Sequence, residues 1–131
     1  MSHAIVNSYI GKPYEYGARG PQAFDCWGLV LHLRAALGLV VPVDFASREA
    51  ARLAHRSGAW GVEAAGGPVP CEPCAGCIVY APGLAHAGVF WCGMVVHSMH
   101  RAGVVAWPMA RWLAHFDESE FYEWPRASSS C

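Results

Sequence analysis

The hydrophobic pattern of the chain changes from a helical to a strand-like period near its middle, and this change limits the folds open to it. Apolar residues between positions 25 and 38 recur at helical spacing, at Cys26, Leu29, Val30, Leu33 and Leu37. Beyond residue 76, short apolar segments alternate with turn residues, which is typical of an antiparallel meander. A helical half followed by a sheet predicts an α+β fold.

Cap and breaker residues set the ends of the expected helices. Asp25 is a favourable N-cap for the central helix, and Gly38 is placed to end it. The expected helices cover residues 2–10, 25–37, 47–56 and 108–115.

The expected strands lie in the second half of the chain. They cover residues 77–80, 86–91, 94–98, 103–107 and 121–124. Residues 11–23 and 57–76 are rich in Gly and Pro, so both segments are expected to be loops.

Length and composition bound the class of protein. With 131 residues, 54% of them hydrophobic and 15% charged, we expect one globular domain over residues 1–131. Its core is expected at about 6–124, with a disordered tail at 125–131.

The net charge of −1, without a basic stripe, argues against nucleic acid as a partner. No apolar run is long enough for a membrane span, and no signal peptide is seen at the N-terminus.

Cys26 is a candidate nucleophile because of its place at the start of the central helix. Unpaired backbone N–H groups and the helix dipole there favour an anion, and the thiolate is the reactive form of cysteine. The N–H groups of Cys26 and Trp27 are also placed to bind an oxyanion. The position alone leaves open a buried structural cysteine.

A predicted hairpin brings two histidines together. If Cys92 and Gly93 form its turn, His86 and His97 share one face as diagonal neighbours, about 7–8 Å apart by Cα. Gly88 then faces His97 and leaves room for the rings. This arrangement suits a base and the group that orients it, although the spacing also allows a structural pair or a metal pair.

The spacing Cys71-x-x-Cys74-x-x-Cys77 indicates a metal or redox site at first sight, with Cys92 as a fourth ligand. The spacing is tight, however, and Cys77 opens an expected strand. From the sequence we therefore expect no metal.

Three blocks of sequence resemble the NlpC-type peptidase family (NlpC/p-sixty). The first joins Gly11-Lys-Pro-Tyr-Glu-Tyr-Gly17 to Phe24-Asp-Cys-Trp-Gly-Leu-Val30, and resembles the family's Tyr-x-Tyr-Gly turn and Asp-Cys-Ser-Gly helix start. The second is Gly76–Tyr80 with His86–Phe90, and the third is Val95-Val-His97-Ser. The resemblance covers about residues 6–124 in the family's order.

The resemblance implies a circularly permuted papain-like fold, with N-terminal helices packed on a central antiparallel sheet. It also implies a cysteine peptidase without metal or cofactor. It implies Cys26 as nucleophile, His86 as base and His97 as orienter. Tyr14 matches a tyrosine near the oxyanion site, and Asp25 matches an aspartate with a structural or substrate-amine contact. Family members usually hydrolyse peptide bonds in peptidoglycan stems.

Two positions depart from the family pattern: Trp27 replaces a serine and Cys77 replaces an aspartate. Trp27 and Tyr16 flank Cys26, which makes them candidates for lining a substrate groove. The Asp-Cys-Trp-Gly-Leu-Val form resembles phage and prophage tail-assembly members of the family. That branch implies tail proteins as partners and a protein that stays in the cytoplasm until it is assembled in a tail or delivered to the periplasm.

We therefore expect a cysteine endopeptidase acting on peptidoglycan stem peptides through Cys26, His86 and His97. The same residues would serve a protein-processing peptidase or an acyltransferase. A non-catalytic tail module or a metal-binding protein are the alternatives from other classes.

Overall fold

The computed structural model describes residues 2–42, residue 44 and residues 68–124. The expected helix at 47–56 and the expected tail at 125–131 lie outside the described residues, as does most of the expected loop at 57–76. Among the described helices, none is long and apolar enough to cross a membrane.

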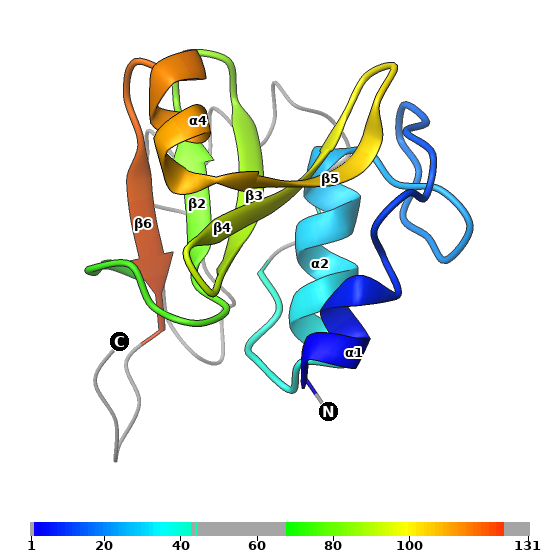
Figure 1. Cartoon of the computed structure of the whole chain (residues 1–131). Helices are drawn as coiled ribbons and strands as arrows, with labels where there is room; N and C mark the ends of the chain where they lie inside the picture. Colours follow the sequence, from blue (N-terminus) through cyan, green and yellow to red (C-terminus); the bar gives the residue numbers. More distant parts are fainter. Residues whose placement is uncertain (1, 43, 45–67, 125–131) are drawn as a thin grey trace.

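Three described helices frame the fold (Figure 1). They are α1 (Ser2–Asn7), α2 (Cys26–Ala36) and α4 (Met109–His115). The first is shorter than expected because Ser8 to Ile10 turn away from it through backbone bonds back to residues 4–7. The central helix begins and ends where its cap residues predict, since Asp25 is its N-cap and Gly38, with a positive φ of 75°, follows its C-cap.

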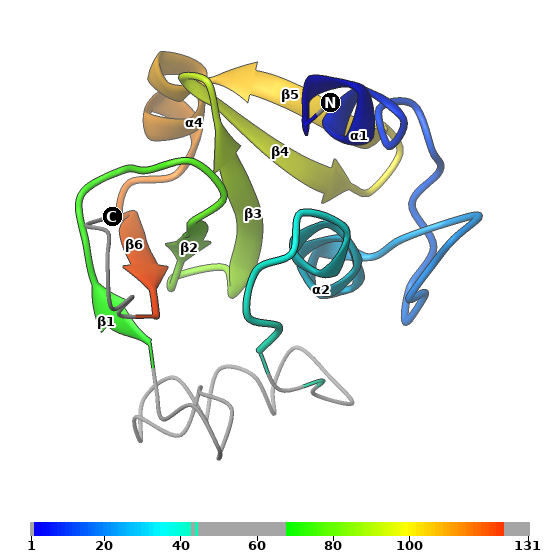
Figure 2. The ribbon, with the colours of Figure 1, turned by 90° about the horizontal axis from the view of Figure 1, so that it is seen from below.

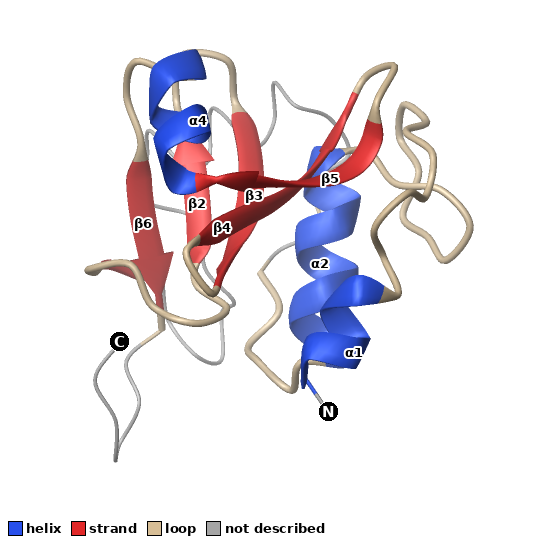
Figure 3. Ribbon diagram, viewed as in Figure 1, coloured by secondary structure: helices blue, strands red, loops and turns tan. Residues whose placement is uncertain are grey.

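The described strands form one antiparallel sheet in the order β1-β6-β2-β3-β4-β5. Their bounds are β1 Val69–Pro70, β2 Ile78–Ala81, β3 His86–Trp91, β4 Met94–Met99, β5 Gly103–Pro108 and β6 Glu120–Glu123. Five of them match expected strands within one residue at each end. β1 falls in a segment expected to be a loop, and it is only a two-residue pairing with β6. The α+β prediction is confirmed, and Figure 3 shows the helices and the sheet in separate colours.

The helices cover opposite faces of the sheet (Figure 2). Side chains of a strand point alternately to the two faces, and on β2 Ile78 and Tyr80 join the core under α1 and α2. Val79 and Ala81 join the second core, under α4. The sheet is thus buried on both sides, and its α4 face is rich in aromatic side chains.

A buried ion pair joins α2 to the far end of the sheet. Arg34 donates to Glu123 at 2.6 Å and 3.1 Å, and to the carbonyl oxygen of Gly76 at 2.6 Å. Both side chains are almost fully enclosed, at 0% and 4% exposure. Because burying two charges is costly unless they are paired, this contact fixes how α2 meets β6.

Candidate active site

Cys26 is the first residue of α2 and is 6% exposed. The residue before it caps the helix, since the backbone N–H of Gly28 donates to Oδ1 of Asp25 at 2.6 Å. Nη1 of Arg19 donates to both carboxylate oxygens of Asp25, at 2.8 Å each. Asp25 therefore acts as the helix cap and is held in place by a cation.

The segment that leads into Cys26 is fastened to the sheet and to the preceding loop. Oγ of Ser98 on β4 donates to the carbonyl oxygen of Phe24 at 2.7 Å. The N–H of Phe24 donates to the carbonyl oxygen of Pro13 at 3.0 Å, beside Tyr14. These bonds place the start of α2 at the end of β4 that carries His97 and next to the Tyr14 loop.

The hairpin of β3 and β4 has the predicted register. Trp91 pairs with Met94 and Phe90 with Val95, and the turn residues Cys92 and Gly93 have φ angles of +50° and +78°. Both turn residues thus adopt the left-handed conformation that a tight two-residue hairpin needs.

Gly88 is packed against the facing strand where His97 lies. A Cβ at Gly88 would come within 2.7 Å of Cγ1 of Val95 and 3.0 Å of Cβ of His97. Only glycine leaves room here for β4 to lie so close.

The two histidines of this hairpin are joined by their ring nitrogens. Nε2 of His86 lies 2.9 Å from Nδ1 of His97, and the rings are nearly perpendicular, at 79°. His97 is fully buried, whereas His86 is 8% exposed. One imidazole is thus held by another that solvent does not reach.

Aromatic rings enclose the pair. The ring of His97 meets Trp107 and Trp112 edge-on, with centroid distances of 4.5 Å and 4.9 Å. His86 stacks on Phe116 at 5.2 Å, with 19° between the ring planes. Nε1 of Trp112 donates to Oγ of Ser119 at 2.8 Å, which fixes the ring against which both histidines pack.

The surroundings of His97 keep its imidazole neutral. Burial lowers the pKa of His97 to about 3, and the nearby charges of His115 and Arg111 contribute to this lowering. The guanidinium of Arg111 lies over the Trp107 ring, 4.2 Å from its centroid. Nε2 of His97 finds no hydrogen-bond partner among the described residues, and the rings of Trp107 and Trp112 pack around it.

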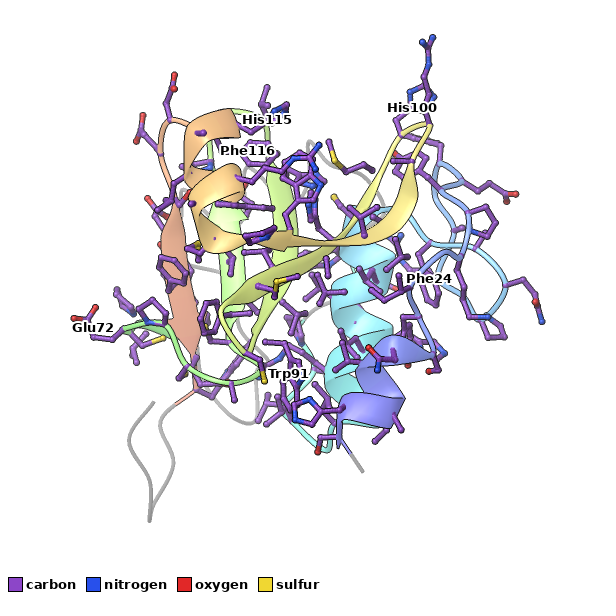
Figure 4. All side chains as sticks on the ribbon, in the orientation of Figure 1. Phe24, Glu72, Trp91, His100, His115 and Phe116 are labelled. Carbon is purple, nitrogen blue, oxygen red and sulfur yellow. The ribbon has the colours of Figure 1, made fainter. Side chains whose placement is uncertain are left out.

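A groove of about 180 Å³ opens beside the histidine pair. Its lining includes Tyr14, His86, Ser98, His100, His115 and Phe116. Figure 4 shows His115 and Phe116 at the end of α4, and His100 at the turn after β4 on the other side. His86 is therefore the member of the pair that a bound substrate can reach.

Of the predicted site residues, the structure brings His86, His97 and Tyr14 together. Tyr14 lines the groove with His86, and Asp25 is engaged as a cap rather than directed to a substrate amine. Trp27 is 6% exposed and belongs to the core under α2, because its indole extends the apolar face of the helix. Tyr16 is 78% exposed and does not line the groove.

Sequence reasoning missed the aromatic enclosure of His97. Trp112 lies in the last helix and Phe116, four residues on, is its C-cap residue, so the two rings lie on the same side of the helix end. That spacing predicts a ring cluster, but only the fold shows that two histidines occupy it.

Comparisons with known proteins bear on the family and the fold of the chain. The sequence profile of the NlpC/P60 family matches residues 11–111. A probable endopeptidase p60 of Listeria grayi is 38% identical over 48 residues, which are 37% of this chain and 9% of that protein. The chain thus corresponds to a small part of this curated relative.

Two solved structures share the fold. The NlpC/p60 domain of the peptidoglycan hydrolase SagA superposes with a TM-score of 0.57 at 24% identity, covering 93% of this chain and 94% of that one. NlpC1 from Trichomonas vaginalis gives a TM-score of 0.60 at 16% identity, covering 95% of this chain and 44% of the other. The papain-like fold implied by the sequence resemblance is therefore confirmed.

Proposed function

Since the chain belongs to the NlpC/P60 family of cysteine peptidases, we propose that it is an endopeptidase that hydrolyses peptide bonds in peptidoglycan stem peptides. Cys26 is the nucleophile, His86 the general base and His97 the residue that orients the base. Tyr14 and the backbone N–H of Cys26 stabilise the oxyanion.

The contact of 2.9 Å between Nε2 of His86 and Nδ1 of His97 carries the proposal. It engages Nε2 of His86, and we assign proton exchange with Cys26 to the other ring nitrogen, Nδ1. To accept that proton on Nδ1, neutral His86 must carry its own proton on Nε2. The Nε2–H group then donates a hydrogen bond to His97. His97 is then the acceptor at Nδ1 and carries its proton on Nε2, directed at the surrounding rings, which are weak acceptors.

The burial of His97 supports this division of roles. Because the pKa of His97 is lowered to about 3, the proton taken from Cys26 stays on His86 and is not passed on. The resulting imidazolium of His86 donates from Nε2 to a neutral acceptor, which stabilises the thiolate–imidazolium pair. The orienting group works without any charge of its own.

The reaction then follows the two-step course of a cysteine peptidase. The Cys26 thiolate attacks the amide carbon, and the oxyanion is bound at the N-terminus of α2 and by the Tyr14 hydroxyl. Imidazolium His86 protonates the leaving amine, which breaks the C–N bond and leaves a thioester. Water, deprotonated by His86, hydrolyses the thioester and regenerates the thiol.

The names of the similar proteins support the substrate class. One is called an endopeptidase and another a peptidoglycan hydrolase. The Asp-Cys-Trp-Gly form around Cys26 resembles tail-assembly members of the family, so we also propose tail proteins as the partners that deliver the enzyme to the wall.

Thiol reactivity tests the proposed catalytic pair. In dilute iodoacetamide, mass spectrometry of digests should show Cys26 alkylated faster than the exposed Cys92, which lies in the β3–β4 turn and is the internal control. His86→Ala should slow alkylation of Cys26 and leave that of Cys92 unchanged. Equal rates at both cysteines in the wild type would contradict the proposal.

A further inference from the structure

A second cluster of reactive side chains lies away from the catalytic pair. The Sγ atoms of Cys71, Cys74 and Cys77 all lie within 4.8 Å of one another. Among the described residues, this is the one group of three or more such ligand side chains close enough to share a metal ion. We propose that, with Cys74 reduced, these three cysteines bind a zinc ion as thiolates.

The distances suit zinc with a small contraction. Zinc binds sulfur at about 2.3 Å in a tetrahedron, which sets neighbouring sulfur atoms about 3.8 Å apart. Each sulfur–sulfur separation needs to shrink by about 1 Å or less from the 4.8 Å limit to reach that spacing. A water molecule is the simplest fourth ligand, and thiolates favour zinc over magnesium or calcium.

Backbone hydrogen bonds to two different strands hold Cys71 and Cys77 in place. The N–H of Cys71 donates to the carbonyl oxygen of Phe121 on β6 at 2.9 Å, and the carbonyl oxygen of Cys77 accepts from the N–H of Phe90 on β3 at 2.9 Å. The turn between Cys74 and Cys77 is closed by a bond of 3.0 Å from the N–H of Cys77 to the carbonyl oxygen of Cys74. The fold thus positions the cysteine ligands before any metal binds.

One of these sulfur atoms also accepts a backbone hydrogen bond. The N–H of Cys74 lies 3.4 Å from Sγ of Cys77 and is directed at it. Such a donor stabilises negative charge on the sulfur, as groups around metal ligands commonly do.

Cys74 is disulfide-bonded in this structure, so the site depends on redox state. A thiol or phosphine reductant delivers two electrons and two protons to that bond and releases the Cys74 thiol. Zinc then displaces one proton from each of the three thiols as three sulfur–zinc bonds form. Oxidising conditions therefore leave the site without its third ligand.

The site is structural and separate from the peptidase chemistry. Cys77 directly precedes β2, whereas His86 pairs with Ala81 at the other end of that strand. Four residues of strand separate the two ends by about 13 Å. Figure 4 shows Glu72, the neighbour of Cys71, at the β6 edge of the sheet, away from His115 and Phe116. The zinc would fasten this edge, where β1 is only two residues long.

Zinc loading of the whole chain tests the proposal. The host is the Cys26→Ala variant, which removes the catalytic thiol as a competing ligand. It is reduced with a phosphine, incubated with zinc and desalted, and its metal content is measured by elemental analysis. We expect about one zinc per chain. A cobalt-substituted sample should show sulfur-to-cobalt charge-transfer absorption.

Matched cysteine variants locate the ligands. Cys71→Ser should lower zinc affinity by more than about tenfold, because losing even an outer contact of a metal ligand costs about 10- to 100-fold. Cys92→Ser is the control and should bind like the host, since Cys92 lies outside the cluster. Thermal melting shows whether each variant is folded. Zinc should raise the Tm of the host but not that of Cys71→Ser. Absence of zinc from the reduced host, or equal retention by Cys71→Ser, would overturn the proposal.

Discussion

Nε2 of His86 lies 2.9 Å from Nδ1 of His97, on neighbouring strands of one hairpin. The contact depends on the register set by the turn at Cys92 and Gly93, since a slip of one residue would turn one ring to the opposite face. The proposed catalysis therefore depends on the register of β3 and β4 and on the buried, neutral imidazole of His97.

Replacing His97 tests its proposed orienting role. His97→Phe keeps an aromatic ring among Trp107 and Trp112 but removes the acceptor for His86, so kcat/KM should fall by about 10²- to 10⁴-fold. His97→Gln restores an acceptor and should lose less. Steady-state kinetics on a wall-peptide substrate measures both, with circular dichroism as the check on folding. Activity of His97→Phe within about threefold of wild type would remove His97 from the mechanism.

The buried neutral state of His97 predicts loss of stability in acid. Its pKa is about 3 in the folded chain and about 6.5 when unfolded, so the unfolded state binds more protons between these values. The free energy of unfolding should therefore fall as pH drops from about 6.5 toward 3, by up to about 1.4 kcal/mol per pH unit from this group. Urea melts over this range measure the slope, and His97→Phe should flatten it. An unchanged slope in that variant would assign the acid sensitivity to other groups.

Gly88 predicts a steric effect on the same pair. In Gly88→Ala the new Cβ would meet the carbonyl oxygen of Val96 at 2.8 Å and Cβ of His97 at 3.0 Å. Relief requires β4 to move, which should cost about 1–3 kcal/mol of stability and displace His97 from His86. Gly83→Ala is the matched control, because a Cβ there has no neighbour within 4 Å. If both variants melt and cleave alike, the packing of this hairpin does not constrain the pair.

The buried ion pair of Arg34 and Glu123 should contribute more to the stability of the fold than an exposed ion pair does. Glu123→Gln leaves the guanidinium buried without its charge partner and should cost about 3–5 kcal/mol. The exposed pair of Arg19 and Asp44 is the comparison, and Asp44→Asn should change stability by about 1 kcal/mol or less. Chemical denaturation separates these values, and similar losses for both variants would contradict the role given to burial.

Features carried by local signals could be predicted from the sequence. Asp25 marks the start of α2, and Cys92 with Gly93 fixes the hairpin that joins His86 to His97. Local pattern decides these elements because caps and tight turns depend on a few adjacent residues.

Features that depend on distant partners could not be predicted this way. Arg34 and Glu123 are 89 residues apart, and neither position signals the other. Trp27 resembles a groove residue by its place beside Cys26, yet the rotation of α2 turns it into the core. The spacing of Cys71, Cys74 and Cys77 allows a metal site but does not establish one, and only the fold shows that their sulfur atoms lie within 4.8 Å of one another.

The most direct test of the central claim is mass spectrometry of muropeptides after purified peptidoglycan is incubated with the wild type, Cys26→Ala and Cys92→Ala. The wild type and Cys92→Ala should release new stem-peptide fragments, and Cys26→Ala should release none. Their masses would identify the bond that is cleaved. The same fragments from Cys26→Ala, or no fragments from a wild type whose Cys26 reacts no faster than Cys92, would contradict the account.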